Sequence, residues 1–282
     1  MMTHLDCGGR ALDLSRTAIM GILNITPDSF SDGGIFLSHD AAVAHALQMV
    51  EEGADLIDVG GESTRPGAQA VPLQEELDRV IPVIEGLART VPVPISIDTS
   101  KPEVMRAAVV AGAGLINDVR ALREAGALSM AAELAVPVCL MHMQGEPRSM
   151  QHGPAYTDVV TEVGNFLEAR IAACVAAGIA RDRIIIDPGF GFGKTAAHNL
   201  ELLRRLTVFR RLGVPILAGL SRKSMIGALF NLPVAQRLHA SVALAVVAVQ
   251  NGATMLRVHD VRATREAIRM LEAVYPRTGE ET

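Results

Sequence analysis

The chain has 282 residues, and 49% of them are hydrophobic, which is enough for the core of one large α/β domain or of two small ones. A formal net charge of −5 and a pI near 5.9 argue against a nucleic-acid or anionic-membrane partner, which would require a positively charged surface. The three cysteines lack CxxC spacing and the N-terminus lacks a signal pattern, so we expect a cytoplasmic protein that is neither exported nor membrane-anchored.

Short apolar runs and segments with helical periodicity alternate along the whole chain. The runs predict strands at 18–26, 56–61, 94–99, 115–119, 137–143, 184–190, 215–221 and 255–260. The periodic segments predict helices at 41–52, 73–89, 102–111, 127–135, 159–178, 200–213, 242–252 and 264–275. Continuous apolar strands indicate a parallel sheet that is buried on both faces. Without a linker or a break in composition, this order favours a closed (β/α)₈ TIM barrel as a single domain, 1–282, over a doubly wound sheet.

Local signals mark several helix ends. Ser100 and Glu103 predict a capping box around Pro102. Glycines stand where five of the predicted helices should stop, at Gly53, Gly112, Gly178, Gly213 and Gly252. These signals agree with the alternation of strands and helices.

Nearly every predicted strand ends in a polar residue, although a buried strand has little use for one. In chain order these are Asn24, Asp58, Asp98, Asn117, His142, Asp187, Ser221 with Lys223, and Arg257 with His259. Three of them, Asp58, Asn117 and Arg257, occupy the sixth position of a weak internal repeat that begins with Gly-Ala. In a barrel all of them would face the carboxyl-terminal mouth, where the active site lies. For Asp58 and His142, a purely structural role in bonding a loop or capping a helix remains open.

The chemistry of this set indicates two neighbouring subsites. Asp98, Asp187 and Asn117 suit an uncharged heterocycle with N–H donors beside acceptors, because carboxylates accept paired hydrogen bonds and amides offer both kinds. Arg257, His259, Asn24 and Arg65 suit an anion with several oxygens. Asn24, with Thr26 and Asp28, could also hold Mg²⁺ on phosphate oxygens. We therefore expect a pocket for a heterocycle carrying a phosphate group.

Three loops are rich in glycine or proline. Residues 26–34 and 62–68 are long and polar for strand-to-helix connections and could act as lids. The stretch "DPGFGFGKT" (187–195) fails the P-loop pattern by one residue. We interpret Pro188 to Gly193 as a turn that admits a flat ring, with no phosphate role required of Lys194.

The motifs "ILNITPDSFSDGG", "DVGGESTRPGA", "SIDTSKPEV", "INDVRAL", "VCLMHMQG", "DPGFGFGKT", "LSRKSMIG" and "RVHDV" occur in order over essentially the whole chain. In these motifs the sequence resembles the dihydropteroate synthase family of the bacterial folate pathway, the target of sulfonamides. The resemblance implies a (β/α)₈ barrel, usually a homodimer. It also implies that, with Mg²⁺, 6-hydroxymethyl-7,8-dihydropterin diphosphate and 4-aminobenzoate are joined into 7,8-dihydropteroate and diphosphate. The carbon–oxygen bond is expected to ionise before the amine attacks.

The family's site residues carry over to matching positions. The pterin pocket falls on Asp98, Asn117, Met141, Asp187, Lys223 and Arg257. The diphosphate site falls on Asn24, Arg65, Arg257 and His259, with Asn24 the expected metal ligand. The aminobenzoate site falls on Thr64, Pro66, Phe192 and Ser224, with Phe30 and Ser63 nearby. Catalytic roles are expected for Lys223, Arg257 and His259.

Two alternative functions remain open at this point. A pterin-dependent methyltransferase that works with a corrinoid protein would not need Arg65, Arg257 and His259 together. A non-catalytic folate-storage barrel would keep the ring-binding residues but lose the anion-binding ones.

Overall fold

A computed structural model describes residues 3–25, 35–63, 70–145, 150 and 153–276. Its main sheet contains eight parallel strands in the order β8-β7-β6-β5-β4-β3-β10-β9. Their bounds are β3 (Ala18–Asn24), β4 (Leu56–Gly60), β5 (Ile95–Asp98), β6 (Leu115–Asp118), β7 (Val138–Met141), β8 (Ile184–Asp187), β9 (Leu217–Ala218) and β10 (Met255–Val258). All eight predicted strands are therefore present, each somewhat shorter than its apolar run.

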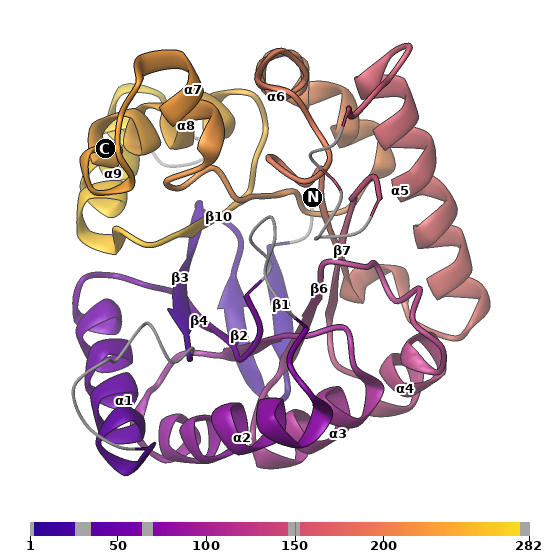
Figure 1. The fold of residues 1–282 in the computed structure, drawn as a ribbon, viewed down its shortest axis with the longest axis vertical. Coiled ribbons are helices and arrows are strands. Elements are labelled where there is room, and N and C mark those ends of the chain that lie inside the picture. Colours follow the sequence, from indigo (N-terminus) through magenta and orange to yellow (C-terminus); the bar gives the residue numbers. More distant parts are fainter. Residues whose placement is uncertain (1–2, 26–34, 64–69, 146–149, 151–152, 277–282) are drawn as a thin grey trace.

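The sheet closes into a barrel between its two end strands, β8 and β9. Ile186 of β8 forms a parallel bridge with Ile216, next to β9, and the Ile186 amide donates to the Pro215 carbonyl at 3.0 Å. This closure confirms the predicted TIM barrel and excludes the doubly wound sheet (Figure 1). That residues 1–282 form one domain stays a prediction.

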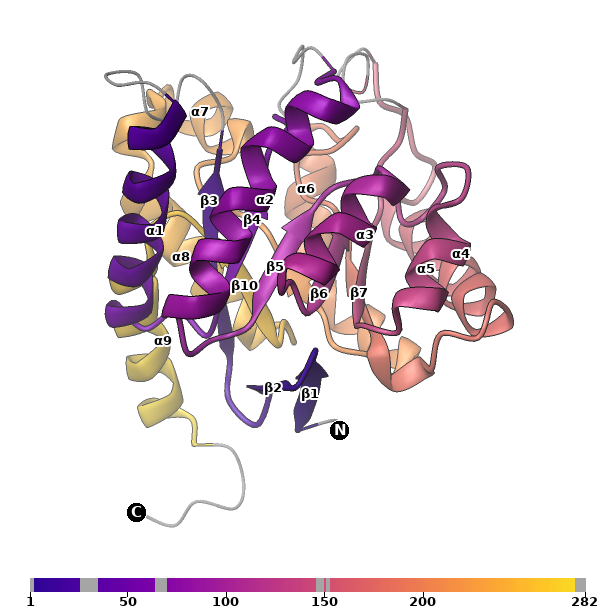
Figure 2. The same ribbon diagram turned by 90° about the horizontal axis from the view of Figure 1, so that it is seen from below.

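Helices surround the barrel (Figures 1 and 2). They are α1 (Ile35–Glu51), α2 (Leu73–Thr90), α3 (Pro102–Ala111), α4 (Ala127–Leu134), α5 (Val159–Ala176), α6 (Ala196–Arg204), α7 (Ser224–Phe230), α8 (Leu238–Gln250) and α9 (Val261–Val274). Three short 3₁₀ helices are η2 (Arg181–Arg183), η3 (Leu206–Leu212) and η4 (Val234–Gln236). Among the described residues, no helix is both long and apolar enough to span a membrane.

Two predicted features of the helices are wrong. The helix expected over 200–213 divides into α6 and η3, because Leu206, Phe209 and Leu212 are buried at a spacing of three, which matches the three residues per turn of a 3₁₀ helix. The capping box does not form, because the Ser100 hydroxyl donates to the Asp118 carboxylate and Lys101 is the N-cap residue of α3. The five glycines predicted at helix ends do follow helices, and all five have positive φ.

A hairpin that the sequence analysis did not predict covers the amino-terminal end of the barrel (Figure 2). Strands β1 (His4–Cys7) and β2 (Arg10–Asp13) pair antiparallel around Gly8 and Gly9, which both have positive φ. Leu5 and Leu12 belong to the same buried cluster as the barrel residues Met20 and Leu56. This apolar plug leaves the opposite end of the barrel for polar residues.

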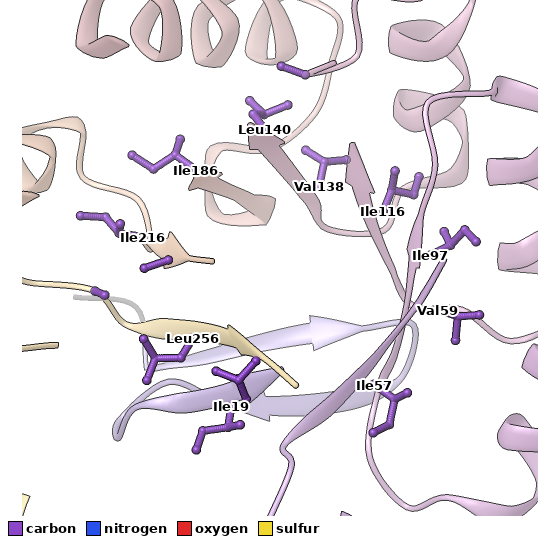
Figure 3. Close-up of a cluster of buried hydrophobic side chains, with 14 of the residues drawn as sticks. Ile19, Ile57, Val59, Ile97, Ile116, Val138, Leu140, Ile186, Ile216 and Leu256 are labelled. Carbon is purple, nitrogen blue, oxygen red and sulfur yellow. The ribbon is translucent and has the colours of Figure 1, made fainter. Parts of the chain in front are cut away.

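Alternate residues of each strand face opposite sides of the barrel wall. Outward-facing residues such as Ile57, Ile97, Ile116 and Ile186 belong to a core cluster shared with the surrounding helices (Figure 3). Met20, Leu56, Leu115 and Ile185 fill the lower interior with the hairpin. Two positions further along three of these strands, facing the same interior, lie Asp58, Asn117 and Asp187.

Candidate active site at the carboxyl ends of the strands

The pairing register brings three predicted site residues to neighbouring strand ends. Asn24 is opposite Gly60, Gly60 is opposite Asp98, and Asp98 is opposite Asn117. A Cβ atom built on Gly60 would lie 3.5 Å from Asp98 Cβ and 3.8 Å from Asn24 Oδ1. Gly60 therefore leaves open the space between these two polar side chains.

The three polar residues of the internal repeat meet inside the barrel. Oδ2 of Asp58 accepts hydrogen bonds from Asn117 Nδ2 at 3.1 Å and from Arg257 Nε at 2.6 Å. Asp58 is fully buried. Asp58 therefore has neither of the two structural roles that were left open for it, bonding a loop or capping a helix. It orients Asn117 and Arg257, which are both expected to contact the ligand.

Arg257 also contacts a second carboxylate, since its Nη2 donates to Asp98 Oδ2 at 2.8 Å. Burial raises the pKa of Asp98 to about 7, although Arg257 opposes this shift. Burial acts to lower the pKa of Arg257, but Asp58 and Asp98 together raise it above its usual range. Arg257 thus remains a cation held between two carboxylates at the mouth.

Asp187 ends β8, and Lys223 directly precedes α7. Burial raises the pKa of Asp187, while a hydrogen bond from the Gly189 amide at 2.7 Å opposes the shift. Burial lowers the pKa of Lys223 to about 8, and Asp187 opposes this shift. Lys223 Nζ lies 4.3 Å from the centroid of the Phe192 ring, a cation–π contact.

An apolar wall adjoins these charged groups. Met141 is opposite Asp187 in the strand register and belongs to a buried cluster with Phe192, Val119 and Met143. The expected pterin and aminobenzoate walls are therefore continuous. Ser224 follows Lys223 as the exposed first residue of α7.

His259 is held by Ser221. The hydroxyl oxygen of Ser221 lies 3.0 Å from His259 Nδ1 and accepts from the His259 amide at 3.2 Å. Burial, followed by the charges of Arg222 and Arg257, lowers the pKa of His259 to about 3. In the free protein this residue is thus a neutral imidazole, so it would meet an anion as a hydrogen-bond donor rather than as a cation.

Six residues with a predicted ligand or metal contact lie outside the described residues: Thr26, Asp28, Phe30, Thr64, Arg65 and Pro66. Ser63 lines a cavity of about 390 Å³ that also includes Asp98. A larger groove of about 690 Å³ between α5 and α6 includes none of the predicted site residues.

The wall of this cavity contains an ion cluster that the sequence did not predict. Lys101 Nζ contacts Glu62 Oε2 at 2.5 Å and also the carboxylate of Glu76, which is almost fully buried. Glu76 also accepts from the Thr99 hydroxyl at 2.6 Å. Lys101 lies in the motif "SIDTSKPEV" and Glu62 in "DVGGESTRPGA". Their partner Glu76 belongs to α2, whose helical pattern did not indicate a buried charge.

Three glycines of the loop after β8 lie close to neighbouring segments, and the admission of a flat ring by this turn stays a prediction. A Cβ atom on Gly189 would lie 1.9 Å from the His142 carbonyl oxygen, and one on Gly193 would lie 2.4 Å from that of Gln144. A Cβ atom on Gly191 would lie 3.1 Å from Lys223 Cδ. These glycines therefore admit neighbouring parts of the protein. Lys194 is buried.

The side chains near Asn24 can be compared with those that Mg²⁺ requires. Within the described ranges, no group of three or more His, Cys, Asp or Glu side chains could form a metal site by itself. Mg²⁺ commonly takes one or two protein oxygens and completes its shell with phosphate oxygens and water. The Asn24 amide oxygen, beside the gap above Gly60, suits this arrangement.

Comparisons with known proteins agree with the geometry. A family model described as pterin binding enzyme matches residues 20–259. The dihydropteroate synthase of Escherichia coli (strain K12) is 56% identical over 265 residues, covering 94% of each chain. The structure of Xanthomonas albilineans dihydropteroate synthase with 4-aminobenzoic acid has a TM-score of 0.93 and 57% identity, covering 98% of this chain and 100% of that one. That enzyme in complex with 7,8-dihydropteroate has a TM-score of 0.89 and 54% identity, with coverages of 97% and 99%.

Proposed function

The chain belongs to the dihydropteroate synthase family of pterin-binding enzymes, and from this premise we propose how its barrel mouth catalyses the family reaction. The substrates are 6-hydroxymethyl-7,8-dihydropterin diphosphate and 4-aminobenzoate. The bond from the 6-methylene carbon to diphosphate oxygen breaks, and its electron pair leaves with diphosphate. The amine nitrogen then bonds to that carbon and releases a proton. The enzyme is thus a transferase of an alkyl group other than methyl.

Asp98, Asn117 and Asp187 bind the pterin ring in this proposal. Each is buried at a strand end, so its hydrogen bonds with the ring form away from competing water. Ionisation places positive charge on the ring, and the two carboxylates stabilise that charge more strongly than they stabilise the neutral substrate. Met141 and the aliphatic part of Lys223 supply apolar contacts to the ring faces.

Arg257, His259 and Lys223 act at the methylene and the leaving group. Arg257 keeps its Nε bond to Asp58 and its Nη2 bond to Asp98, and we expect Nη1 to donate to the diphosphate. Neutral His259 donates a hydrogen bond to a phosphate oxygen. These groups favour departure of the anion without any protein nucleophile.

We propose that Asn24 supplies one oxygen ligand to Mg²⁺. When bound, the ion would withdraw charge from the diphosphate oxygens and so assist their departure. Asn24 and Arg257 lie on adjacent strands, β3 and β10, which places this ligand beside the cationic end of the pocket. Arg65 is proposed to join them at the diphosphate.

The second substrate is proposed to bind against Phe192, with Thr64, Pro66 and Ser224. The continuous apolar cluster from Met141 to Phe192 supports a benzoate ring placed next to the pterin methylene. A sulfonamide drug has an aniline ring like that of 4-aminobenzoate, so we expect it to compete for this subsite.

The observation that carries the proposal is the placement of Arg257 between Asp58 and Asp98. It puts one ring-binding carboxylate, Asp98, and the anion-binding cation within one hydrogen-bonded unit. The test is to incubate the chain with both substrates and Mg²⁺ and to measure 7,8-dihydropteroate and diphosphate. Without amine, ¹⁸O in the bridging position of the pterin diphosphate should exchange into non-bridging positions. Product formed without any such exchange would contradict ionisation before attack.

A homodimer and a cytoplasmic location are also proposed. Exposed apolar side chains, Leu229, Phe230, Val234 and Val247, occur on the successive elements α7, η4 and α8 and support a partner surface for a second copy. The three cysteines are unpaired and buried, which is compatible with a reducing compartment. Sedimentation velocity of the wild-type chain and of Phe230→Asp tests the dimer.

A further inference from the structure

Lys194 is a buried cation that the proposed reaction does not use. Its side chain is among the most buried polar groups, at 2% exposure. Its Nζ lies 2.8 Å from the Gly189 carbonyl oxygen, 3.0 Å from that of Phe192 and 2.9 Å from Nδ1 of His142. The His142 carbonyl oxygen is a fourth acceptor at 3.3 Å. An ammonium has three N–H donors, so these acceptors satisfy it and leave no donor for a ligand.

Burial lowers the pKa values of both His142 and Lys194. Burial lowers the pKa of His142 to about 2, so its ring is neutral, and Nδ1 can accept if Nε2 carries the hydrogen. Burial also lowers the pKa of Lys194 to about 7, while the charge of Asp187 opposes that shift. The imidazole packs edge-on against Phe166, with ring centroids 4.9 Å apart, which fixes its orientation.

Lys194 joins two segments that carry substrate contacts. His142 follows Met141 at the end of β7, and its amide donates to the carbonyl of Asp187 at the end of β8 at 3.0 Å. Gly189 and Phe192 belong to the loop after β8. The loop lies so close to β7 that a Cβ atom on Gly189 would overlap the His142 carbonyl oxygen. The Lys194 ammonium therefore links the residue after β7, His142, to the loop after β8.

We propose that Lys194 is a positioning residue: it fixes the loop of residues 189–192 against His142, and thereby sets Asp187 for the pterin ring and Phe192 for the aminobenzoate. This inference rests on the function proposed above. The contact between Phe192 and Lys223 depends on the same loop, so a loosened loop would displace both sides of the pocket. Displacements of about 1 Å can reduce catalytic rates by about 10².

The test compares Lys194→Met with Arg10→Met. Methionine keeps the apolar stem of Lys194 but removes all three donors. Arg10 is a matched control because its guanidinium also donates to three backbone carbonyls, those of Ala88, Val91 and Val93, at 2.7, 3.0 and 2.8 Å. It lies in the hairpin at the opposite end of the barrel (Figure 2). Both variants should melt at lower temperature than the wild type.

The measurements are the affinities for 6-hydroxymethylpterin and for 4-aminobenzoate by calorimetry, together with kcat and KM for both substrates. We expect Lys194→Met to weaken pterin binding about tenfold or more and to raise both KM values. We expect Arg10→Met to leave these quantities within about twofold of the wild type. A folded Lys194→Met with wild-type affinities and KM values would overturn the proposal.

A second variant covers the case in which Lys194→Met does not fold. His142→Phe keeps the ring packing on Phe166 but removes the Nδ1 acceptor, and we expect it to weaken pterin binding at least about threefold. Wild-type affinity in His142→Phe would also overturn the proposal. Failure of the wild-type chain to form 7,8-dihydropteroate would instead overturn the proposed function, so the two failures are distinguishable.

Discussion

Nε of Arg257 lies 2.6 Å from Oδ2 of Asp58, a residue 199 positions earlier in the chain. The same guanidinium contacts Asp98, so one cation balances two buried carboxylates. Removal of such a cation leaves uncompensated buried charge, and the predictions for this site must therefore separate stability from catalysis.

Arg257→Ala should lower kcat by about 10²–10³, because a group that stabilises the departing anion is lost. It should also destabilise the fold by about 3–5 kcal/mol, since Asp58 and Asp98 lose their partner. Turnover must be measured on the folded fraction, quantified by circular dichroism.

Arg265→Ala is the matched control for that experiment. Arg265 pairs with Asp55 and donates to the Gly53 and Thr17 carbonyls at the amino ends of β3 and β4, away from the mouth. The Arg265→Ala variant should be less stable than the wild type but should keep the wild-type kcat. Equal turnover per folded molecule in both variants would remove Arg257 from the leaving-group site.

Asp98→Asn should weaken the binding of 6-hydroxymethylpterin by about 1–3 kcal/mol, because an amide NH₂ would face a ring donor in a buried site. Titration calorimetry measures the change. Asp118→Asn is the control, since buried Asp118 accepts from the Arg120 and Leu122 amides at 2.8 and 2.7 Å and from the Ser100 hydroxyl, and is not an expected pterin contact. If both variants bind the pterin equally well, Asp98 does not bind the ring.

Pterin affinity should depend on pH through Asp98 and Lys223. The pKa of Asp98 is raised to about 7, so the accepting carboxylate becomes populated only as the pH rises through that value, and affinity should rise with it. The pKa of Lys223 is lowered to about 8, so its cation is lost above that value, and affinity should fall again. The optimum is thus expected between these two values.

Calorimetric titrations across this pH range test the pH dependence. In Asp98→Asn the acid limb should disappear, because an amide does not titrate, while the alkaline limb should remain. An unchanged acid limb in that variant would assign the protonation to another carboxyl group, such as Asp187, whose pKa is also raised by burial.

Asn24→Ala should reduce the Mg²⁺-dependent part of diphosphate binding by about tenfold, or ~1.4 kcal/mol, because one oxygen ligand is lost. Binding without Mg²⁺ should change little. Calorimetry of diphosphate with and without Mg²⁺ measures both terms. Asn251→Ala, which removes a hydrogen bond to the Leu203 carbonyl far from the mouth, should behave as the wild type. An undiminished Mg²⁺ effect in Asn24→Ala would place the ion elsewhere.

Much of the fold was predictable because strand and helix patterns are local. The run from Ile184 to Asp187 and the periodic helix from Leu73 follow from side-chain spacing over a few residues. Where local patterns were weak, prediction failed: the hairpin at Gly8 and Gly9 joins strands of four residues each, and α7 is only seven residues long.

The sequence by itself also determined that the polar residues share one end of the barrel, since parallel strands all point their carboxyl ends the same way. Which of them touch was decided only by the tertiary structure. The bonds of Arg257 to Asp58 and Asp98 require closure of the barrel between Ile186 and Ile216 and a particular strand register. The contact of Lys194 with His142 depends on how the segment after β7 packs against the loop after β8. Contacts between distant residues are set by chain closure and burial, which no local spacing encodes.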